Sequence, residues 1–343
     1  MTNPPKQRPE RRHPPRDRNQ NRPAPRPLGG INTRWAGFRP LFDYWGNEIV
    51  RFYKLETLAS AVDWSLHTKR DRFLIPSIQE VLGPAPVVSL AFELFQEGRY
   101  QFIFRLRALN ARRKEAFFAF VVAKRADYSK LAALEHANLR VIHERAPDFV
   151  VRPFRGGNIY LPDRHGRVEH GRDIYAYVTQ WLAGFHELGV NDRLQFIINV
   201  KARHTFTIDQ TEQLKAKIIE IVAKTYSPKK RDCMDLPEIA SGDLVVTAPP
   251  KPLRLKLIAC RRMLRNITPV KLLDKIAAAS WPWGDTRFYL APQDARMFYD
   301  AFARAFGQDI ARDTFTQYAA AVQSGKLPER DALPRHALAE LTS

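Results

Sequence analysis

Residues Phe117–Glu135 read FFAFVVAKRADYSKLAALE and place two different kinds of element next to each other. The run 116–123 contains only alanine, phenylalanine and valine, and such a short aromatic and β-branched run favours a buried strand. A helical pattern follows, because Leu131 and Leu134 begin a set of apolar residues that share one helix face. The sequence therefore predicts a central strand and then an amphipathic helix over residues 129–144.

Two charged residues mark the ends of this unit. Lys124 stands at the end of the strand, and Glu135 lies eleven residues later on the helix. A lysine leaving a central strand and an acid on the next helix can meet, and such a pair can hold the α- and β-phosphates of a nucleotide. The alternative is a solvated lysine before an ordinary helix, because a single V-A-x-K motif is weak. The order of the surrounding elements favours the first interpretation.

The surrounding segments predict an antiparallel sheet followed by a helical region. Residues 87–108 alternate on both sides of a turn at 96–99 that contains Gly98, which predicts a hairpin. Two more strands are expected at 149–154 and 174–180. The elements expected after them are helices at 208–225, 269–279, 293–306 and 310–323, and strands at 244–247 and 253–258.

Composition and pattern divide the 343 residues into five parts. A chain of this length suffices for a bilobal domain with a sizeable core. Residues rich in proline and arginine cannot bury apolar surface, so the first part is expected to be disordered. The parts are a basic disordered tail at 1–30, a helical cap at 31–86, an antiparallel sheet with one helix at 87–182, a helical lobe at 183–325 and a flexible tail at 326–343.

The charge balance is strongly basic, with a net charge of +19. The first 28 residues hold one Lys and seven Arg against Glu10 and Asp17, so they supply +6 of this total. A field of this sign favours polyanionic partners, whether nucleic acid, nucleotides or an anionic membrane surface. The sequence therefore predicts nucleic acid as a partner of the 1–30 tail, with a solvated leader as the alternative.

The cysteines and the apolar runs bear on the compartment. Cys233 and Cys260 are the only cysteines, which indicates no disulfide framework and a reducing compartment. The apolar runs are far shorter than the roughly 18 residues of a membrane span. The N-terminus also lacks the apolar core of a signal peptide. We expect a cytoplasmic protein with no membrane span.

The order of motifs resembles the protein-kinase-like superfamily, in its aminoglycoside and choline phosphotransferase branch, over residues 87–310. The resemblance rests on the hairpin, VVAKR, an acid on the next helix, YAYVTQWLAGF at 175–185, a long helix and SGDL at 241–244. It implies an α+β, bilobal kinase-like fold, in which an antiparallel N-lobe sheet carries one helix and the C-lobe is mainly helical.

The resemblance also implies roles for individual residues. Asp243, in SGDL where these families carry HGDL, would take the proton from the acceptor hydroxyl. The turn that contains Gly98 would cover ATP, and the main chain after the strand at 174–180 would bind the adenine edge. The implied nucleotide-binding residues are Lys124, Glu135, Gly98, Gln180, Trp181 and Leu182.

Three positions depart from the family pattern. Gly98 is the single glycine of the covering turn, where kinases have several. Ala248 stands where an asparagine is expected, and Arg261 follows Ala259-Cys260 where kinases carry an aspartate. The two replaced residues are the magnesium ligands of the family, and neither replacement supplies a suitable oxygen. The resemblance therefore implies poor Mg²⁺ binding.

Three functions remain open from the sequence. The first is a pseudokinase that binds a nucleotide or small phosphorylated molecule, with Arg261 or Arg262 offsetting phosphate charge. The second is an active phosphotransferase with metal ligands from elsewhere, for which Asp235 and Glu238 are the nearest acids. The third is a basic nucleic-acid-associated protein. The sequence favours the first and leaves open whether the protein is an enzyme.

Overall fold

A computed structural model describes residues 31–36, 55–68, 71–162, 171–199, 203–236, 241–283 and 286–342. The basic tail expected at residues 1–30 is a separate unit and lies outside this part. None of the described helices combines the length and the apolarity that crossing a membrane requires.

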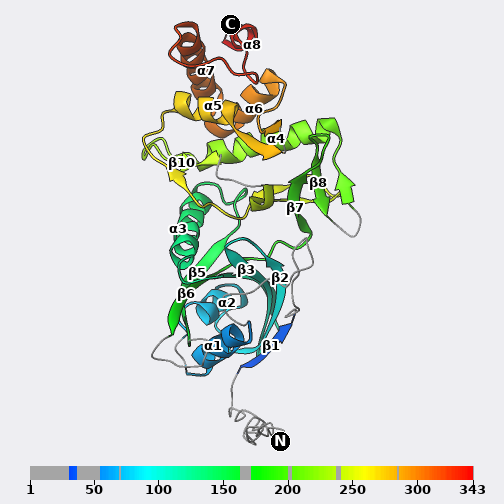
Figure 1. Cartoon of the computed structure of the whole chain (residues 1–343), viewed down its shortest axis with the longest axis vertical. Helices are drawn as coiled ribbons and strands as arrows, with labels where there is room; N and C mark the ends of the chain where they lie inside the picture. The colour runs from blue at the N-terminus through cyan, green and yellow to red at the C-terminus, as the bar shows by residue number, and fades with distance from the viewer. Residues whose placement is uncertain are drawn as a thin grey trace, which may run out of the picture. The chain divides into compact units, whose positions relative to one another are not determined.

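A six-stranded sheet, here called the N-terminal sheet, forms the first half of the described chain (Figure 1). The strand order is β1-β2-β3-β4-β6-β5, and all neighbours are antiparallel except β1 and β2. Side chains alternate along each strand, so Phe92, Phe104 and Phe120 share the buried face. The strands are β1 (Asn32–Ala36), β2 (Val87–Glu97), β3 (Gln101–Asn110), β4 (Glu115–Ala123), β5 (Pro153–Leu161) and β6 (Arg172–Gln180).

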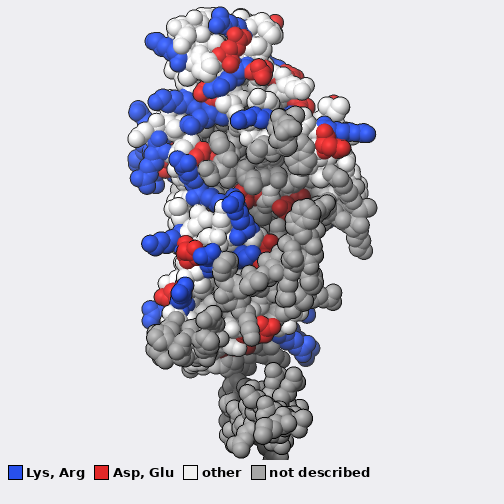
Figure 2. Space-filling view, viewed as in Figure 1, with Lys and Arg blue, Asp and Glu red and all other residues white. Residues whose placement is uncertain are grey.

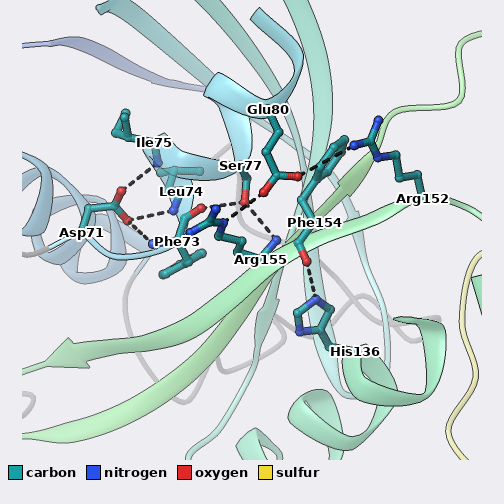
Figure 3. A network of polar contacts seen from close by, with 10 residues as sticks. All are labelled: Asp71, Phe73, Leu74, Ile75, Ser77, Glu80, His136, Arg152, Phe154 and Arg155. Atoms are coloured by element: carbon teal, nitrogen blue, oxygen red, sulfur yellow. Dashed lines mark hydrogen bonds and ion pairs between the residues drawn. The ribbon is translucent and has the colours of Figure 1, made fainter. Parts of the chain in front are cut away.

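Three helices contact the N-terminal sheet: α1 (Leu55–His67), α2 (Leu74–Leu82) and α3 (Ser129–Arg145). Asp71 fixes the start of α2, because its carboxylate accepts the backbone N–H groups of Leu74 and Ile75 at 2.9 and 2.7 Å (Figure 3). Ser77 joins α2 to β5 by accepting the backbone N–H of Arg155 at 3.0 Å.

The expected helical cap at 31–86 holds α1 and α2, but residues 32–36 form the strand β1 instead. The physical reason is aromatic packing. Trp35 stacks on Phe92 of β2 at a centroid distance of 4.0 Å, with the rings 7° from parallel. A strand adjacent to β2 places this indole against the sheet.

The second half of the chain contains five helices and further strands. A five-stranded sheet of order β12-β11-β7-β8-β9 lies among them, and this C-terminal sheet makes the lobe less purely helical than expected. The helices are α4 (Ile208–Thr225), α5 (Pro269–Ala278), α6 (Ala295–Phe306), α7 (Gln308–Gln323) and α8 (Arg335–Thr342). The strands of the sheet are β7 (Phe185–Val190), β8 (Phe196–Asn199), β9 (Arg203–Thr205), β11 (Leu244–Thr247) and β12 (Leu255–Leu257). Two small pairs join β10 (Cys233–Met234) to β13 (Met263–Leu264), and β14 (Ser280–Trp283) to β15 (Thr286–Tyr289).

The flexible tail expected at 326–343 is wrong for the residues that the structure describes. Leu333 and Leu338 are 0% and 1% exposed. Arg330 also places its Nε 2.9 Å from a carboxylate oxygen of Asp274 on α5. A segment that buries two leucines and makes a guanidinium–carboxylate pair is part of the folded core.

The predicted fold class is confirmed. The chain is α+β, its N-terminal sheet is antiparallel apart from the added strand β1, and the second half is rich in helices.

Candidate functional site

Arg261 lies at the centre of three charged side chains, here called the central cluster, with Asp243 and Glu135. Its two terminal nitrogens lie 2.5 and 2.6 Å from the two carboxylate oxygens of Asp243. Its Nε lies 3.5 Å from Oε2 of Glu135. One planar guanidinium therefore pairs with Asp243 through two parallel hydrogen bonds and also contacts a second acid.

The main chain around the cluster holds the three side chains in place. Asn138 of α3 donates its amide to the carbonyl of Cys260 at 3.0 Å, which fixes α3 beside the segment that carries Arg261. The N–H of Ile258 donates to the carbonyl of Asp243 at 2.8 Å. Asp243 ends the 3₁₀ turn η3 (Ser241–Asp243) directly before β11. Arg261 therefore contacts one acid at the start of a strand, Asp243, and one acid on the helix α3, Glu135.

Glu135 is almost fully buried and has two further partners. Its Oε1 accepts hydrogen bonds from the phenol of Tyr177 at 2.5 Å and from the amide of Gln101 at 2.9 Å. Burial raises the pKa of Glu135, while these hydrogen bonds and the charge of Arg261 oppose the rise. Burial, with the nearby charge of Glu135, raises the pKa of Tyr177 well above its usual range, so Tyr177 stays a donor.

Asp243 stabilises the charged form of Arg261. Burial lowers the pKa of the guanidinium, but the hydrogen bonds and charge of Asp243, followed by the charge of Glu135, more than offset this effect and raise it. Asp243 is only 5% exposed, so little water competes for its oxygens. In this geometry each carboxylate oxygen of Asp243 accepts a hydrogen bond from Arg261.

The expected pair of Lys124 with Glu135 is not formed between these two described residues. Lys124 instead places its Nζ 2.7 Å from Oε1 of Glu97 and donates to the carbonyl of Gly98 at 3.2 Å. Both partners belong to the turn between β2 and β3, which the resemblance placed over the nucleotide. The reason is competition: Arg261, Tyr177 and Gln101 already satisfy Glu135, and Gln101 lies opposite Ala123, next to Lys124.

A third acid lies beside the central cluster. Glu187 of β7 accepts a hydrogen bond from Gln96 of β2 at 3.1 Å, which joins the N-terminal and C-terminal sheets. Gly242 leaves room for it, because a Cβ on that residue would overlap the Glu187 carboxylate. Burial raises the pKa of Glu187, the charge of Asp243 adds to this, and the hydrogen bond from Gln96 opposes it.

The segment expected to bind the adenine edge follows β6. The N–H of Gln180 donates to the carbonyl of Arg152 at 2.8 Å, and the carbonyl of Leu182 accepts from Phe185 at 3.2 Å. The ring of Trp181 packs edge-on against Phe95 of β2, with centroids 4.9 Å apart. The structure thus brings Trp181 close to the strand that leads into the Gly98 turn, and an adenine-binding role stays a prediction.

The residues present do not fit a magnesium centre. Mg²⁺ requires several oxygen ligands in near-octahedral geometry. Asp243 offers both of its oxygens to Arg261, and Ala248 has no side-chain oxygen. Of the two replacement acids, Asp235 pairs with Arg262 at 3.4 Å, and Glu238 lies outside the described residues.

Four residues of the site were missed by sequence reasoning. Three of them lie on strands that the sequence predicted and the fourth on β7, which it did not, and their types signal no chemistry by themselves. A usable signal exists for Tyr177, because it lies within the predicted strand 174–180, where a buried phenol requires a partner. The missed residues are Glu97, Gln101, Tyr177 and Glu187.

Comparisons with known proteins reach only a distant structural likeness. No protein-family model matches the chain, and no curated protein matches it. Among solved structures, the apoenzyme of macrolide 2'-phosphotransferase MphH from Brachybacterium faecium matches with 12% sequence identity and a TM-score of 0.33. The match covers 78% of this chain and 97% of that chain. At this level of similarity the match says nothing of ligand or activity in this protein.

Proposed function

We propose that this chain is a kinase-like pseudokinase that binds a nucleotide or a small phosphorylated molecule without magnesium. The observation that supports this most is the pairing of Arg261 with both oxygens of Asp243, at 2.5 and 2.6 Å. A carboxylate held in this way would have to give up two charge-assisted hydrogen bonds before it could orient an acceptor hydroxyl. It is also a poor metal ligand, because Mg²⁺ would have to displace a cation that the fold places there.

Lys124 is the residue that we expect to contact a phosphate. Its side chain is 13% exposed and that of Glu97 is 7% exposed, so this pair is shielded from water. A phosphate oxygen that replaced the Glu97 carboxylate would preserve the charge balance around Lys124, and the Gly98 turn would have to move with Glu97. Ligand binding would then be an exchange of one anion for another on a fixed cation.

The runner-up is an active phosphotransferase with non-standard metal ligands. This function requires Arg261 to leave Asp243, so that Asp243 can orient the acceptor hydroxyl. When the guanidinium leaves, two buried acids lose their compensating positive charge. This loss is strongly unfavourable unless a metal ion takes the place of the guanidinium. The two functions therefore differ in their dependence on magnesium.

A thermal-shift titration with ATP separates the two functions. The protein is titrated with ATP in Mg²⁺ and again in EDTA, as wild type, Lys124→Ala and the matched control Lys130→Ala, which changes an exposed lysine on α3. We expect a metal-independent stabilisation, about 2.7 kcal/mol at a ligand concentration of 100 Kd, that Lys124→Ala removes and Lys130→Ala keeps. A shift that needs Mg²⁺ would favour the active enzyme. The absence of any shift would overturn nucleotide binding.

A basic surface favours a second candidate function, the binding of nucleic acid. Figure 2 shows lysine and arginine side chains gathered over α5 and β10. Backbone contacts bring the segments that carry these side chains together. The N–H of Ile267 donates to the carbonyl of Arg231 at 2.9 Å, and β10 pairs with β13. The lysines and arginines on and next to these elements along the chain are Lys229, Lys230, Arg231, Arg262, Arg265, Lys271 and Lys275.

Salt dependence tests this second candidate. Neutralising phosphates releases counterions, so the logarithm of affinity for duplex DNA falls with the logarithm of salt concentration. We expect the double variant Lys229→Gln/Lys230→Gln to bind more weakly and with a shallower salt slope than wild type. Removal of residues 1–28 tests the predicted tail in the same assay. An affinity that is the same at every salt concentration, in the double variant and after removal of residues 1–28 would count against a nucleic-acid partner.

We also retain the cytoplasm as the proposed compartment. Cys233 and Cys260 are free and buried. Burial, followed by nearby acids, raises the pKa of each thiol to about 12, so both stay protonated and poorly reactive. A protein with two unpaired thiols suits a reducing environment.

A further inference from the structure

A pocket of about 600 Å³ lies beside the edge strand β5 and is here called the β5 pocket; none of the three residues of the central cluster lines it. Helices α2 and α3 supply its walls together with β5, β6 and Arg72, which lies two residues before α2. Clefts of roughly 300–1,000 Å³ are the size that small molecules occupy. The polar residues that line it are Arg72, Glu80, His136, Arg140, Arg155 and Tyr175.

The charge of the β5 pocket is positive. Its single lining acid, Glu80, is already used, because its oxygens lie 3.0 Å from Arg155 and 3.8 Å from Arg152 (Figure 3). Arg72 and Arg140 are exposed, and no acid among the described residues pairs with either of them. Two guanidinium groups with free donors therefore border one cavity.

The floor of the β5 pocket is a fixed hydrogen-bond chain. A carbonyl only accepts, so Nε2 of His136 donates to the carbonyl of Phe154 at 3.0 Å. Burial lowers the pKa of His136, and the charge of Arg140 lowers it further against that hydrogen bond, so the ring is neutral. Nδ1 of the neutral ring then accepts the phenolic proton of Tyr175 at 2.9 Å. The Tyr175 oxygen is left as an acceptor.

A bulge in β5 builds this floor. The pairing of β5 with β6 shifts between Pro153 and Gly156, and the released backbone groups turn to His136 and to Ser77 (Figure 3). Gly156 is required next to it, because a Cβ there would lie 2.6 Å from the Tyr175 oxygen and 2.8 Å from Nδ1 of His136.

We propose that the β5 pocket binds a small phosphorylated molecule, with its phosphate on Arg72 and Arg140 and a ligand hydroxyl donating to Tyr175. Guanidinium groups match phosphate oxygens in geometry and charge. A dianion satisfies two arginines that have no carboxylate partner in the part of the chain that the structure describes. The concave shape and the acceptor on the floor favour a phosphorylated metabolite over a polymer, whose phosphates would need an open groove.

Calorimetric titration at constant ionic strength tests the proposal, with inorganic phosphate and glucose 6-phosphate as probes. The variants are Arg72→Gln, Arg140→Gln and the control Arg312→Gln, which removes an exposed arginine from α7. We expect Arg72→Gln and Arg140→Gln each to raise the dissociation constant of both probes about tenfold, which is the effect of losing a hydrogen bond to a charged group. The control should bind as wild type. Tyr175→Phe should reduce the preference for glucose 6-phosphate over inorganic phosphate.

This proposal stands or falls separately from nucleotide binding at Lys124. Lys124→Ala should leave unchanged the binding of the probes that is lost in Arg72→Gln and Arg140→Gln. The proposal is overturned if neither probe gives saturable heat, or if Arg140→Gln and Arg72→Gln bind as tightly as wild type. It is also overturned if Lys124→Ala alone abolishes binding, since the probes would then occupy the central site. Preference for a phosphorylated peptide over glucose 6-phosphate would overturn the small-molecule assignment.

Discussion

Arg261 contacts both carboxylate oxygens of Asp243, and its Nε faces Glu135 at 3.5 Å. One guanidinium thus supplies positive charge to two acids that come from separate elements, η3 and α3. Asp243 and Glu135 are 5% and 1% exposed. The folded protein therefore depends on the positive charge of Arg261 to stabilise two buried acids.

Replacing the central cation should cost considerable stability. Arg261→Gln leaves Asp243 without its bidentate partner, and we expect the free energy of unfolding to fall by about 3–5 kcal/mol. Arg261→Lys keeps the charge but loses the fork, so its loss should be smaller. Urea denaturation measures both. Arg262→Gln is the control, since that side chain is 62% exposed and its pair with Asp235 is worth at most about 1 kcal/mol. Equal effects of the two glutamine variants would contradict the central role of Arg261.

Removing the acid that competes for Lys124 should strengthen ligand binding. Glu97→Gln breaks the 2.7 Å ion pair without changing the size of the side chain. If the proposed function is correct, affinity for ATP in EDTA should rise, about tenfold for 1.4 kcal/mol. Glu93→Gln on the same strand removes the exposed pair with Arg105 and should leave the affinity unchanged. Weaker binding by Glu97→Gln would show that Glu97 supports the ligand site.

Glu187 should make stability fall as pH rises. Burial and the charge of Asp243 raise its pKa in the folded protein, so the folded state keeps this proton to a higher pH than the unfolded state. The stability that the proton contributes is complete below the unfolded pKa and is lost as pH rises through the raised folded pKa. Glu187→Gln cannot ionise. The unfolding free energy of Glu187→Gln should therefore increase relative to that of wild type as pH rises above the ordinary glutamate pKa of about 4.3. A difference between the two proteins that is independent of pH would refute this.

The last helix should contribute to global stability. Leu338 of α8 is 1% exposed, so Leu338→Ala should lower the free energy of unfolding by about 2–5 kcal/mol through lost burial and a residual cavity. His336→Ala, on the exposed side of the same helix, should change it by no more than about 0.5 kcal/mol. Similar small effects from both variants would restore the expectation of a flexible tail.

Periodicity was sufficient for the larger elements. The alternation of β2 and β3 and the 3.6-residue pattern of α4 are long enough that their hydrophobic faces determine their structure. The strands β8 and β9 have four and three residues, which is too short to show such a pattern. Their pairing with β7 depends on neighbours that only the folded chain provides.

The pairing of the charged residues was not predictable from the order of the motifs. Which cation pairs with which acid depends on competition from neighbours: Tyr177 and Gln101 already donate to Glu135, whereas Glu97 lies 2.7 Å from Lys124. The β5 pocket gave no sequence signal, because Arg72, Arg140 and Arg155 come from separate segments where each resembles an ordinary solvated residue.

The covalent attachment of Arg261 has a consequence for the whole junction between the two halves of the chain. A magnesium ion occupies its site in proportion to its free concentration, whereas a tethered guanidinium has an effective concentration fixed by the backbone. Asn138 and Ile258 hold that backbone against α3 and η3. The contacts that Arg261 makes at this junction should therefore persist in chelator and in nucleotide-free buffer. The guanidinium should remain between the two acids whatever the supply of metal and nucleotide in the cell.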